Sequence, residues 1–130
     1  MSSHYTHKNI SEVKDSAPEF GLDENQEARF ATEALDASEA GFSFHRIKAG
    51  KRQAFGHRHD DAEEVYFVVS GKGRMKLDDD IVELAEHDVI RVAGGVTRAF
   101  EGGDDGLEVL AFGARHPEDR GEIVQGWWSD

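Results

Sequence analysis

From Gly41 onward, short runs rich in apolar, β-branched and aromatic residues alternate with clusters of glycine and aspartate. Such runs, recurring about every eight to twelve residues, are typical of the strands of an all-β sandwich or barrel. The predicted strands are residues 42–48, 65–69, 74–77, 81–84, 89–92, 97–101, 107–112 and 122–128. The predicted turns are residues 70–73, 78–80, 93–95 and 101–106. Because Gly and Asp accept the backbone angles of tight turns, this pattern predicts an all-β domain made mostly of hairpins.

The part of the chain before Gly41 follows a different pattern. Residues 1–25 are polar and include Pro18, which predicts an arm that is loose or lies on the outside of the domain. Residues 26–37 are rich in Ala, Glu and Leu, and this composition favours a helix. We therefore divide the chain into a polar N-terminal arm, residues 1–25, and a barrel domain, residues 26–130.

Composition and charge exclude several classes of function. The 130 residues include 27 acidic and 15 basic side chains, giving a net charge of −12 without any basic run. This balance argues against binding to nucleic acid or to an anionic membrane surface. The chain has no cysteine, so disulfides and thiolate metal sites are excluded. Because the longest apolar run, residues 65–69, is too short for a bilayer and the N-terminus lacks a secretory signal, we expect a cytoplasmic protein.

The stretch richest in side chains that can bind a metal ion is HRHDDAEEVYFVVSG, which begins at His57. On an extended chain, the period of two places the imidazoles of His57 and His59 on the same face. Glu64 begins the apolar run that follows, so it shares a face with Tyr66, while Glu63 points to solvent. Two imidazoles and one carboxylate form a donor set typical of non-haem iron and related metal centres. The alternative is a polar loop with surface histidines, which is the usual meaning of an isolated H-x-H.

At these residues the sequence resembles the cupin superfamily, in particular its small single-domain members. The first motif of that family is a glycine, then H-x-H, a glutamate after a short spacer, and a glycine after the next strand. This chain matches it with Gly50, His57, His59, Glu64 and Gly71. The resemblance implies a double-stranded β-helix, a jelly-roll barrel whose two sheets enclose a pocket, with His57, His59 and Glu64 as metal ligands.

The second motif of the family is matched less completely. In the corresponding stretch, EHDVIRVAGGVTRAFEG, Asp88 and Gly95 stand at the expected positions. Three positions carry residues other than the usual ones, and these are His87, Ala93 and Gly102. Arg98 stands where the family has a histidine as its fourth metal ligand. Because a guanidinium group stays charged and only donates hydrogen bonds, Arg98 cannot coordinate a cation.

Arg98 leaves three arrangements open. In the first, a metal ion binds His57, His59 and Glu64 while Arg98 attracts an anionic ligand toward it. In the second, Arg98 pairs with Glu64 and takes the place of the metal ion. In the third, Arg98 binds a carboxylate or phosphate of the substrate through a bidentate contact, with or without metal. The cofactor implied by the first arrangement is a divalent ion of iron, manganese, nickel or zinc.

The resemblance also leads to expectations about function. We expect the pocket to bind a small-molecule substrate through Arg98, Tyr66 and Phe100. The leading hypothesis is a cupin that binds a small anionic organic molecule and, as an enzyme, is a metal-dependent oxygenase or isomerase. The alternatives are a non-catalytic, metal-free binding or sensor module, and a structural dimerisation domain. We expect a homodimer, because the family resemblance implies one and sheet edges need covering. The pattern around His45 and Arg46 leaves open which of them faces the pocket.

Overall fold

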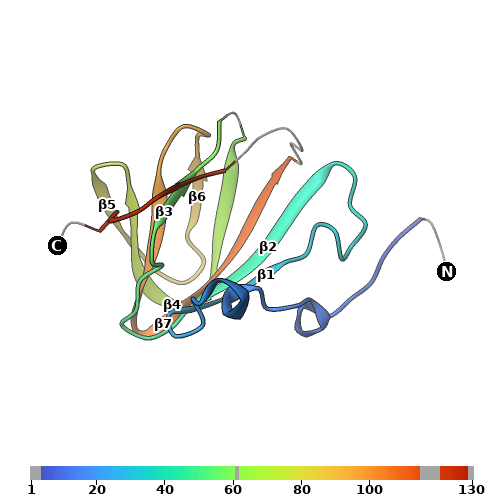
Figure 1. Cartoon of the computed structure of the whole chain (residues 1–130), viewed down its shortest axis with the longest axis horizontal. Helices are drawn as coiled ribbons and strands as arrows, with labels where there is room; N and C mark the ends of the chain where they lie inside the picture. The colour runs from blue at the N-terminus through green and yellow to red at the C-terminus, as the bar shows by residue number, and fades with distance from the viewer. Residues whose placement is uncertain (1–3, 61, 115–120, 129–130) are drawn as a thin grey trace.

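The described part of the chain, residues 4–60, 62–114 and 121–128, forms a curled antiparallel β-sheet in this computed structural model (Figure 1). The strands are β1 (Gln26–Phe30), β2 (Ala40–Ile47), β3 (Gly56–Arg58), β4 (Glu64–Leu77), β5 (Asp80–Leu84), β6 (Val89–Val92), β7 (Arg98–Ala114) and β8 (Glu122–Val124). Two 3-10 helices, η1 (Ile10–Glu12) and η2 (Ala17–Phe20), precede them. The strand order is β1-β2-β7-β3-β8, and β4 pairs with β5, β6 and β7. The predicted all-β fold is confirmed.

The two longest strands, β4 and β7, pair along most of their length and join the other strands into one sheet. Their register shifts between Val68 and Ser70 and again between Gly71 and Gly73. At this bulge Gly71 has a φ of +84°, and a Cβ atom there would lie 2.1 Å from the carbonyl oxygen of Gly106. Only glycine accepts both the positive φ and this close approach of two backbones.

The turns predicted for residues 70–73 and 101–106 are therefore wrong, because both segments lie inside strands. Glycine-rich segments suit a β-bulge as well as a chain reversal, since both require backbone conformations that other residues avoid. In each case two predicted short strands are one long strand; these pairs are residues 65–69 with 74–77 and residues 97–101 with 107–112. The strand predicted for residues 89–92 coincides with β6.

The helix predicted for residues 26–37 is wrong, because strand β1 begins this segment. Strand β1 pairs with β2, so that Gln26 lies opposite Ile47 and Ala28 lies opposite His45. Gln26 and Ala28 are buried, whereas the residues next to them are more exposed. Packing against the neighbouring strand thus outweighs the helix preference of these residues, which is small.

The N-terminal arm is attached to β1 by hydrogen bonds. The carboxylate of Asp15 accepts hydrogen bonds from the backbone N–H groups of Ala17 and Ala28, both at 3.0 Å. The backbone N–H of Ser16 donates to the carbonyl oxygen of Ala28 at 2.7 Å. The arm runs on toward the N-terminus at the end of the molecule that is remote from β5 (Figure 1). The domain boundary after residue 25 stays a prediction.

The core is a cluster of buried apolar side chains to which β4 and β7 contribute most. It consists of Ile47, Tyr66, Val68, Met75, Leu84, Val92, Phe100, Leu107, Val109 and Ala111. Along β4, Tyr66 and Val68 alternate with more exposed residues, as the period of two predicts. Burial of one large apolar side chain stabilises a fold by about 1.5–3 kcal/mol, so this cluster stabilises the sheet that carries the site described below. Among the residues described, no helix has the length and apolar character of a membrane span.

Candidate metal centre and ligand cavity

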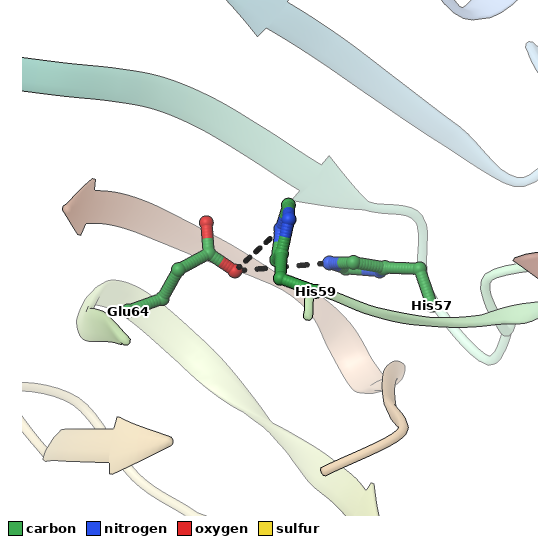
Figure 2. A group of neighbouring side chains, drawn as sticks. All are labelled: His57, His59 and Glu64. Carbon is green, nitrogen blue, oxygen red and sulfur yellow. Dashed lines mark ion pairs between the residues drawn. The ribbon is translucent and has the colours of Figure 1, made fainter. Parts of the chain in front are cut away.

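Three side chains that can bind a metal ion meet near the start of β4. His57 lies on β3, opposite Arg98 of β7. His59 follows β3, and its backbone N–H donates to the carbonyl oxygen of Gly94 at 3.0 Å. Glu64 is the first residue of β4. Both imidazoles point toward the carboxylate of Glu64 (Figure 2), so the structure brings together the three metal ligands that the sequence predicts.

The distances between these groups are close to those around a single metal ion, with all three ligand atoms within 4.8 Å of one another. The Nε2 atoms of His57 and His59 lie 3.8 Å and 3.5 Å from Oε1 of Glu64. Two ligands of a tetrahedral ion with bonds of about 2.1 Å would be about 3.4 Å apart. Two imidazoles and a carboxylate are also a donor set that divalent first-row ions accept. A small inward movement of the side chains would complete a three-ligand site with positions left for a further ligand.

Arg98 contacts the same carboxylate from within the protein. Its side chain has no exposed surface, and its Nη2 lies 2.5 Å from Oε1 of Glu64. Its Nε donates to the hydroxyl oxygen of Tyr66 at 3.2 Å, and its Nη1 donates to the carbonyl oxygen of Val96 at 2.7 Å. The hydroxyl of Tyr66 in turn donates to Oε1 of Glu64 at 2.6 Å. Oε1 of Glu64 therefore accepts hydrogen bonds from the guanidinium of Arg98 and the phenol of Tyr66, and the two imidazoles point toward it.

These contacts fix the charge states at the site. Burial alone would raise the pKa of Glu64, but interactions with His57, His59, Tyr66 and Arg98 outweigh it and hold that pKa well below its usual range. Burial and the nearby carboxylate raise the pKa of Tyr66 well above its usual range. Glu64 is therefore a carboxylate and Tyr66 a neutral donor near neutral pH, which are the forms needed to bind a metal ion or Arg98.

A cavity of about 420 Å³ adjoins these side chains. Small residues line part of its wall, namely Ala28, Gly41, Ser43, Ala62, Ala111, Gly113 and Ala114. Aromatic residues line another part, namely Phe20, Phe30, Phe42, Phe55, Tyr66 and Phe100. Tyr66 and Phe100 meet edge to face, with ring centroids 5.2 Å apart. The small residues leave room for a ligand, and the aromatic rings give it an apolar surface.

Of the three predicted substrate-binding residues, two line the cavity and one is buried behind it. Tyr66 and Phe100 line the cavity, together with His57, His59 and Glu64. Arg98, in contrast, is fully buried, and its guanidinium is directed to Glu64, Tyr66 and backbone carbonyls. A direct role of these residues in binding a substrate stays a prediction. In this arrangement Arg98 affects the cavity by neutralising the carboxylate of Glu64, which lines it.

Several residues of the cavity wall were not identified from the sequence. Strand β2 contributes His45, whose orientation the sequence pattern left open, while Arg46 forms ion pairs with Glu27 and Glu108. Strand β1 contributes Gln26, in the segment predicted to be helical. The N-terminal arm contributes Ser16, Ala17, Phe20 and Leu22. The polar sequence of the arm carries no signal for this role, because only its packing on β1 brings it to the cavity.

Comparisons with known proteins identify the family. A model of the cupin domain matches residues 43–112, more than half of the chain. Among curated proteins, none has a sequence that matches this chain. The solved structures that it resembles include a cupin protein from Bacteroides fragilis, with a TM-score of 0.71, 20% sequence identity and a match covering 99% of both chains.

Two further similar structures are enzymes. A sugar phosphate isomerase from Silicibacter pomeroyi matches with a TM-score of 0.72 and 14% identity, over 92% of this chain and 82% of the isomerase chain. A salicylate 1,2-dioxygenase from Pseudaminobacter salicylatoxidans matches with a TM-score of 0.68 and 15% identity, over 83% of this chain and 34% of the dioxygenase chain. At these identities the likeness shows the fold, which is the predicted jelly roll. The family match over residues 43–112 and the shared fold together show that this chain belongs to the cupin family.

Proposed function

We propose that this cupin binds a divalent ion of iron, manganese, nickel or zinc through His57, His59 and Glu64, and that it acts on a small anionic organic molecule. The observation that carries the proposal is the convergence of three metal-ligating side chains on the wall of a cavity of about 420 Å³. A cavity of this size takes a ligand built around one ring or a short chain. The reaction we propose is of the oxygenase or isomerase type.

The names of two similar structures support this class of ligand. One is a sugar phosphate isomerase. The other is a salicylate 1,2-dioxygenase, of which a variant was crystallised in complex with gentisate. Both proteins handle small organic anions on a fold that this chain shares. Because a shared fold hosts many activities, the residues of this site have to carry the proposal.

The residues of the chain prepare the site for such a ligand. A bound divalent ion would act as a Lewis acid toward an oxygen atom of the ligand. The hydroxyl of Tyr66 donates to Oε1 of Glu64 and so helps to orient the carboxylate toward the imidazoles. Arg98 balances the charge of Glu64, which reduces the repulsion that this carboxylate would exert on an anion. Phe100 and the ring of Tyr66 provide an apolar wall beside the charged groups.

A second candidate function is binding of a small anion without metal. The observation that favours it is the contact of 2.5 Å between Nη2 of Arg98 and Oε1 of Glu64, which places a cation at the carboxylate that a metal ion would use. His57 and His59 would then serve as hydrogen-bond donors to the ligand. In that case the protein is a non-catalytic binding or sensor module.

Elemental analysis of the protein, purified without chelator and without an affinity tag, separates the two candidates. The metal-dependent function predicts about one ion of iron, manganese, nickel or zinc per chain, as a three-ligand site holds one ion. The metal should be lost in His59→Ala and retained in His87→Asn, a control in which the substituted ring stacks on Phe67. Protein that stays free of metal after reconstitution would contradict the metal-dependent function and favour the second candidate.

The cytoplasmic location and the homodimer stay predictions. One face of the sheet carries exposed apolar side chains that do not line the cavity, with Val65 39%, Phe112 41% and Val89 67% exposed. Val65 and Phe112 lie opposite each other on β4 and β7. A second copy of the chain packed on this face would remove these side chains from water. Light scattering of the full chain measures its mass in solution and so tests the dimer.

A further inference from the structure

Two buried polar atoms on the cavity wall have no hydrogen-bond partner among the described residues. They are Oε1 of Gln26 and Nδ1 of His45. Gln26 is 8% exposed, and the other ring nitrogen of His45 lies 2.9 Å from the hydroxyl oxygen of Ser43. Buried polar atoms are nearly always hydrogen-bonded, because one left without a partner destabilises the fold. Two such atoms on one cavity wall therefore point to a ligand that completes them.

The pairing of β1 with β2 brings the two side chains together. Gln26 lies opposite Ile47 and Ala28 lies opposite His45, so Gln26 and His45 are diagonal neighbours on the same face of the sheet. Gln26, Ala28 and His45 all line the cavity. Because Ala28 has only a methyl group, the space beside the carboxamide and the imidazole stays open to a ligand. The two polar groups can thus contact one ligand group at the same time.

The charge of this wall selects the kind of ligand group. Burial lowers the pKa of His45 to about 4, with His57 acting in the same direction and Glu64 in the opposite one. The imidazole is therefore neutral at pH 7, and the carboxamide of Gln26 carries no charge. A neutral imidazole and a carboxamide can each donate and accept a hydrogen bond, as a hydroxyl group does. Phe30 meets the ring of His45 edge to face, with centroids 5.6 Å apart, so the surroundings suit an apolar ring.

We infer that Gln26 and His45 form a second polar subsite of the cavity, which hydrogen-bonds a hydroxyl group on a ring-containing ligand. Strand β7 separates β2 from β4. The strand of His45 is therefore roughly 10 Å from the strand of Glu64. His45 and Glu64 line the same cavity of about 420 Å³, so a ligand of that size built on one substituted ring can contact both walls. This inference rests on the proposed function, because it assigns a further group to the ligand of the same cavity.

Binding of four small molecules tests the subsite. Toluene and p-cresol differ by one hydroxyl group, and so do benzoate and 4-hydroxybenzoate. NMR titration of the full-length protein gives the dissociation constant of each. We expect the hydroxyl group to tighten binding about tenfold in at least one pair, as a net gain of one or two hydrogen bonds implies. This gain should disappear in Gln26→Met and in His45→Phe, while the affinity for toluene shows that the cavity is intact.

Gln53→Met is the matched control for Gln26→Met. Gln53 is also 8% exposed and lines the same cavity. Its Oε1, however, already accepts a hydrogen bond from the backbone N–H of Phe100 at 3.0 Å. The gain from the hydroxyl group should therefore persist in Gln53→Met. Asparagine at position 45 places a nitrogen or oxygen near the position of Nδ1, so His45→Asn should recover part of the gain that His45→Phe loses.

The outcomes separate this inference from the proposed function. A hydroxyl group that adds no affinity in either pair, or whose gain survives both Gln26→Met and His45→Phe, would overturn the subsite. If p-cresol binds more tightly than toluene while neither benzoate binds, the subsite holds and the anionic ligand of the proposed function fails. If both benzoates bind equally and p-cresol does not exceed toluene, the anionic ligand holds and the subsite fails. Binding of none of the four would overturn both.

Discussion

The cavity has two polar walls, which differ in whether the protein itself supplies partners for their hydrogen-bonding groups. On the charged wall, formed by His57, His59 and Glu64, one carboxylate oxygen is met by two imidazoles, a phenol and a guanidinium. On the neutral wall, formed by Gln26 and His45, two buried polar atoms lack a partner among the described residues. The charged wall is therefore stabilised within the protein, whereas the neutral wall needs a ligand to satisfy it. Substitutions on the two walls should change stability in opposite directions.

The largest expected effect is at Arg98, which lies behind the charged wall and contacts Glu64. Arg98→Met removes the guanidinium that neutralises Glu64 and leaves a carboxylate that is only 21% exposed without a cation of permanent charge. Removing one partner of a buried ion pair costs about 3–5 kcal/mol, and we expect the lower end because of the remaining exposure of Glu64. Urea denaturation of metal-free protein measures this loss in the free energy of unfolding.

A double variant shows whether the effect of Arg98→Met comes from the unpaired charge. Glu64→Gln removes the charge that Arg98 neutralises while keeping the shape of the side chain. The double variant Arg98→Met/Glu64→Gln should therefore be more stable than Arg98→Met alone. If the two destabilisations simply add, the ion pair is not what holds this wall, and the comparison between the walls fails.

An intermediate effect is expected at His45 when the pH is lowered. The pKa of His45 is about 4 in the folded protein and about 6.5 in the unfolded chain, because burial disfavours the charged imidazole. Between these values the unfolded chain binds more protons, so stability falls as the pH falls from about 6.5 to about 4. Above pH 6.5 this loss is absent. We expect a decrease of about 2 kcal/mol, allowing for solvent near a partly exposed ring.

The comparison of wild type with His45→Phe isolates this contribution. Phenylalanine does not titrate, so the free energy of unfolding of the variant should fall less steeply between about pH 6.5 and 4. Denaturant titrations at several pH values in this window measure both slopes. Equal slopes would mean that the imidazole becomes protonated in the folded state without cost, and the wall around His45 would then not be neutral.

The charged wall could be predicted from the sequence because its geometry is local. His57 and His59 share a face through the period of two, and Glu64 follows within the same short stretch. The motif spacing added the expectation that Glu64 lies beside the two histidines, and Figure 2 shows that it does. The contact of Arg98 with Glu64 was one of three arrangements left open, because the choice depends on how β7 packs against β4.

The neutral wall could not be predicted, because it depends on pairing between separate strands. The composition of residues 26–37 favours a helix, and a helical Gln26 would have no relation to His45. Only the register of β1 against β2 places them on one face. The full length of the two long strands was missed for a related reason. Gly71 and Gly106 lie in glycine-rich segments that are typical of turns, and only the close approach of their two backbones reveals a bulge. Long-range register is the part that local patterns lack.

The smallest expected effect is a gain in stability at Gln26. Gln26→Met replaces a carboxamide whose Oε1 has no partner among the described residues by an apolar side chain of similar length. Without ligand, this should raise the free energy of unfolding by about 1 kcal/mol, since an unsatisfied buried acceptor is removed. The same substitution at Gln53 removes a hydrogen bond to the backbone N–H of Phe100 and should lower stability by a similar amount. Denaturant titration of the two variants measures both changes. The two glutamines are equally buried and differ in whether the protein supplies a hydrogen-bond donor to Oε1. If Gln26→Met destabilises as much as Gln53→Met, the carboxamide of Gln26 serves the fold, and the neutral wall is not kept open for a ligand.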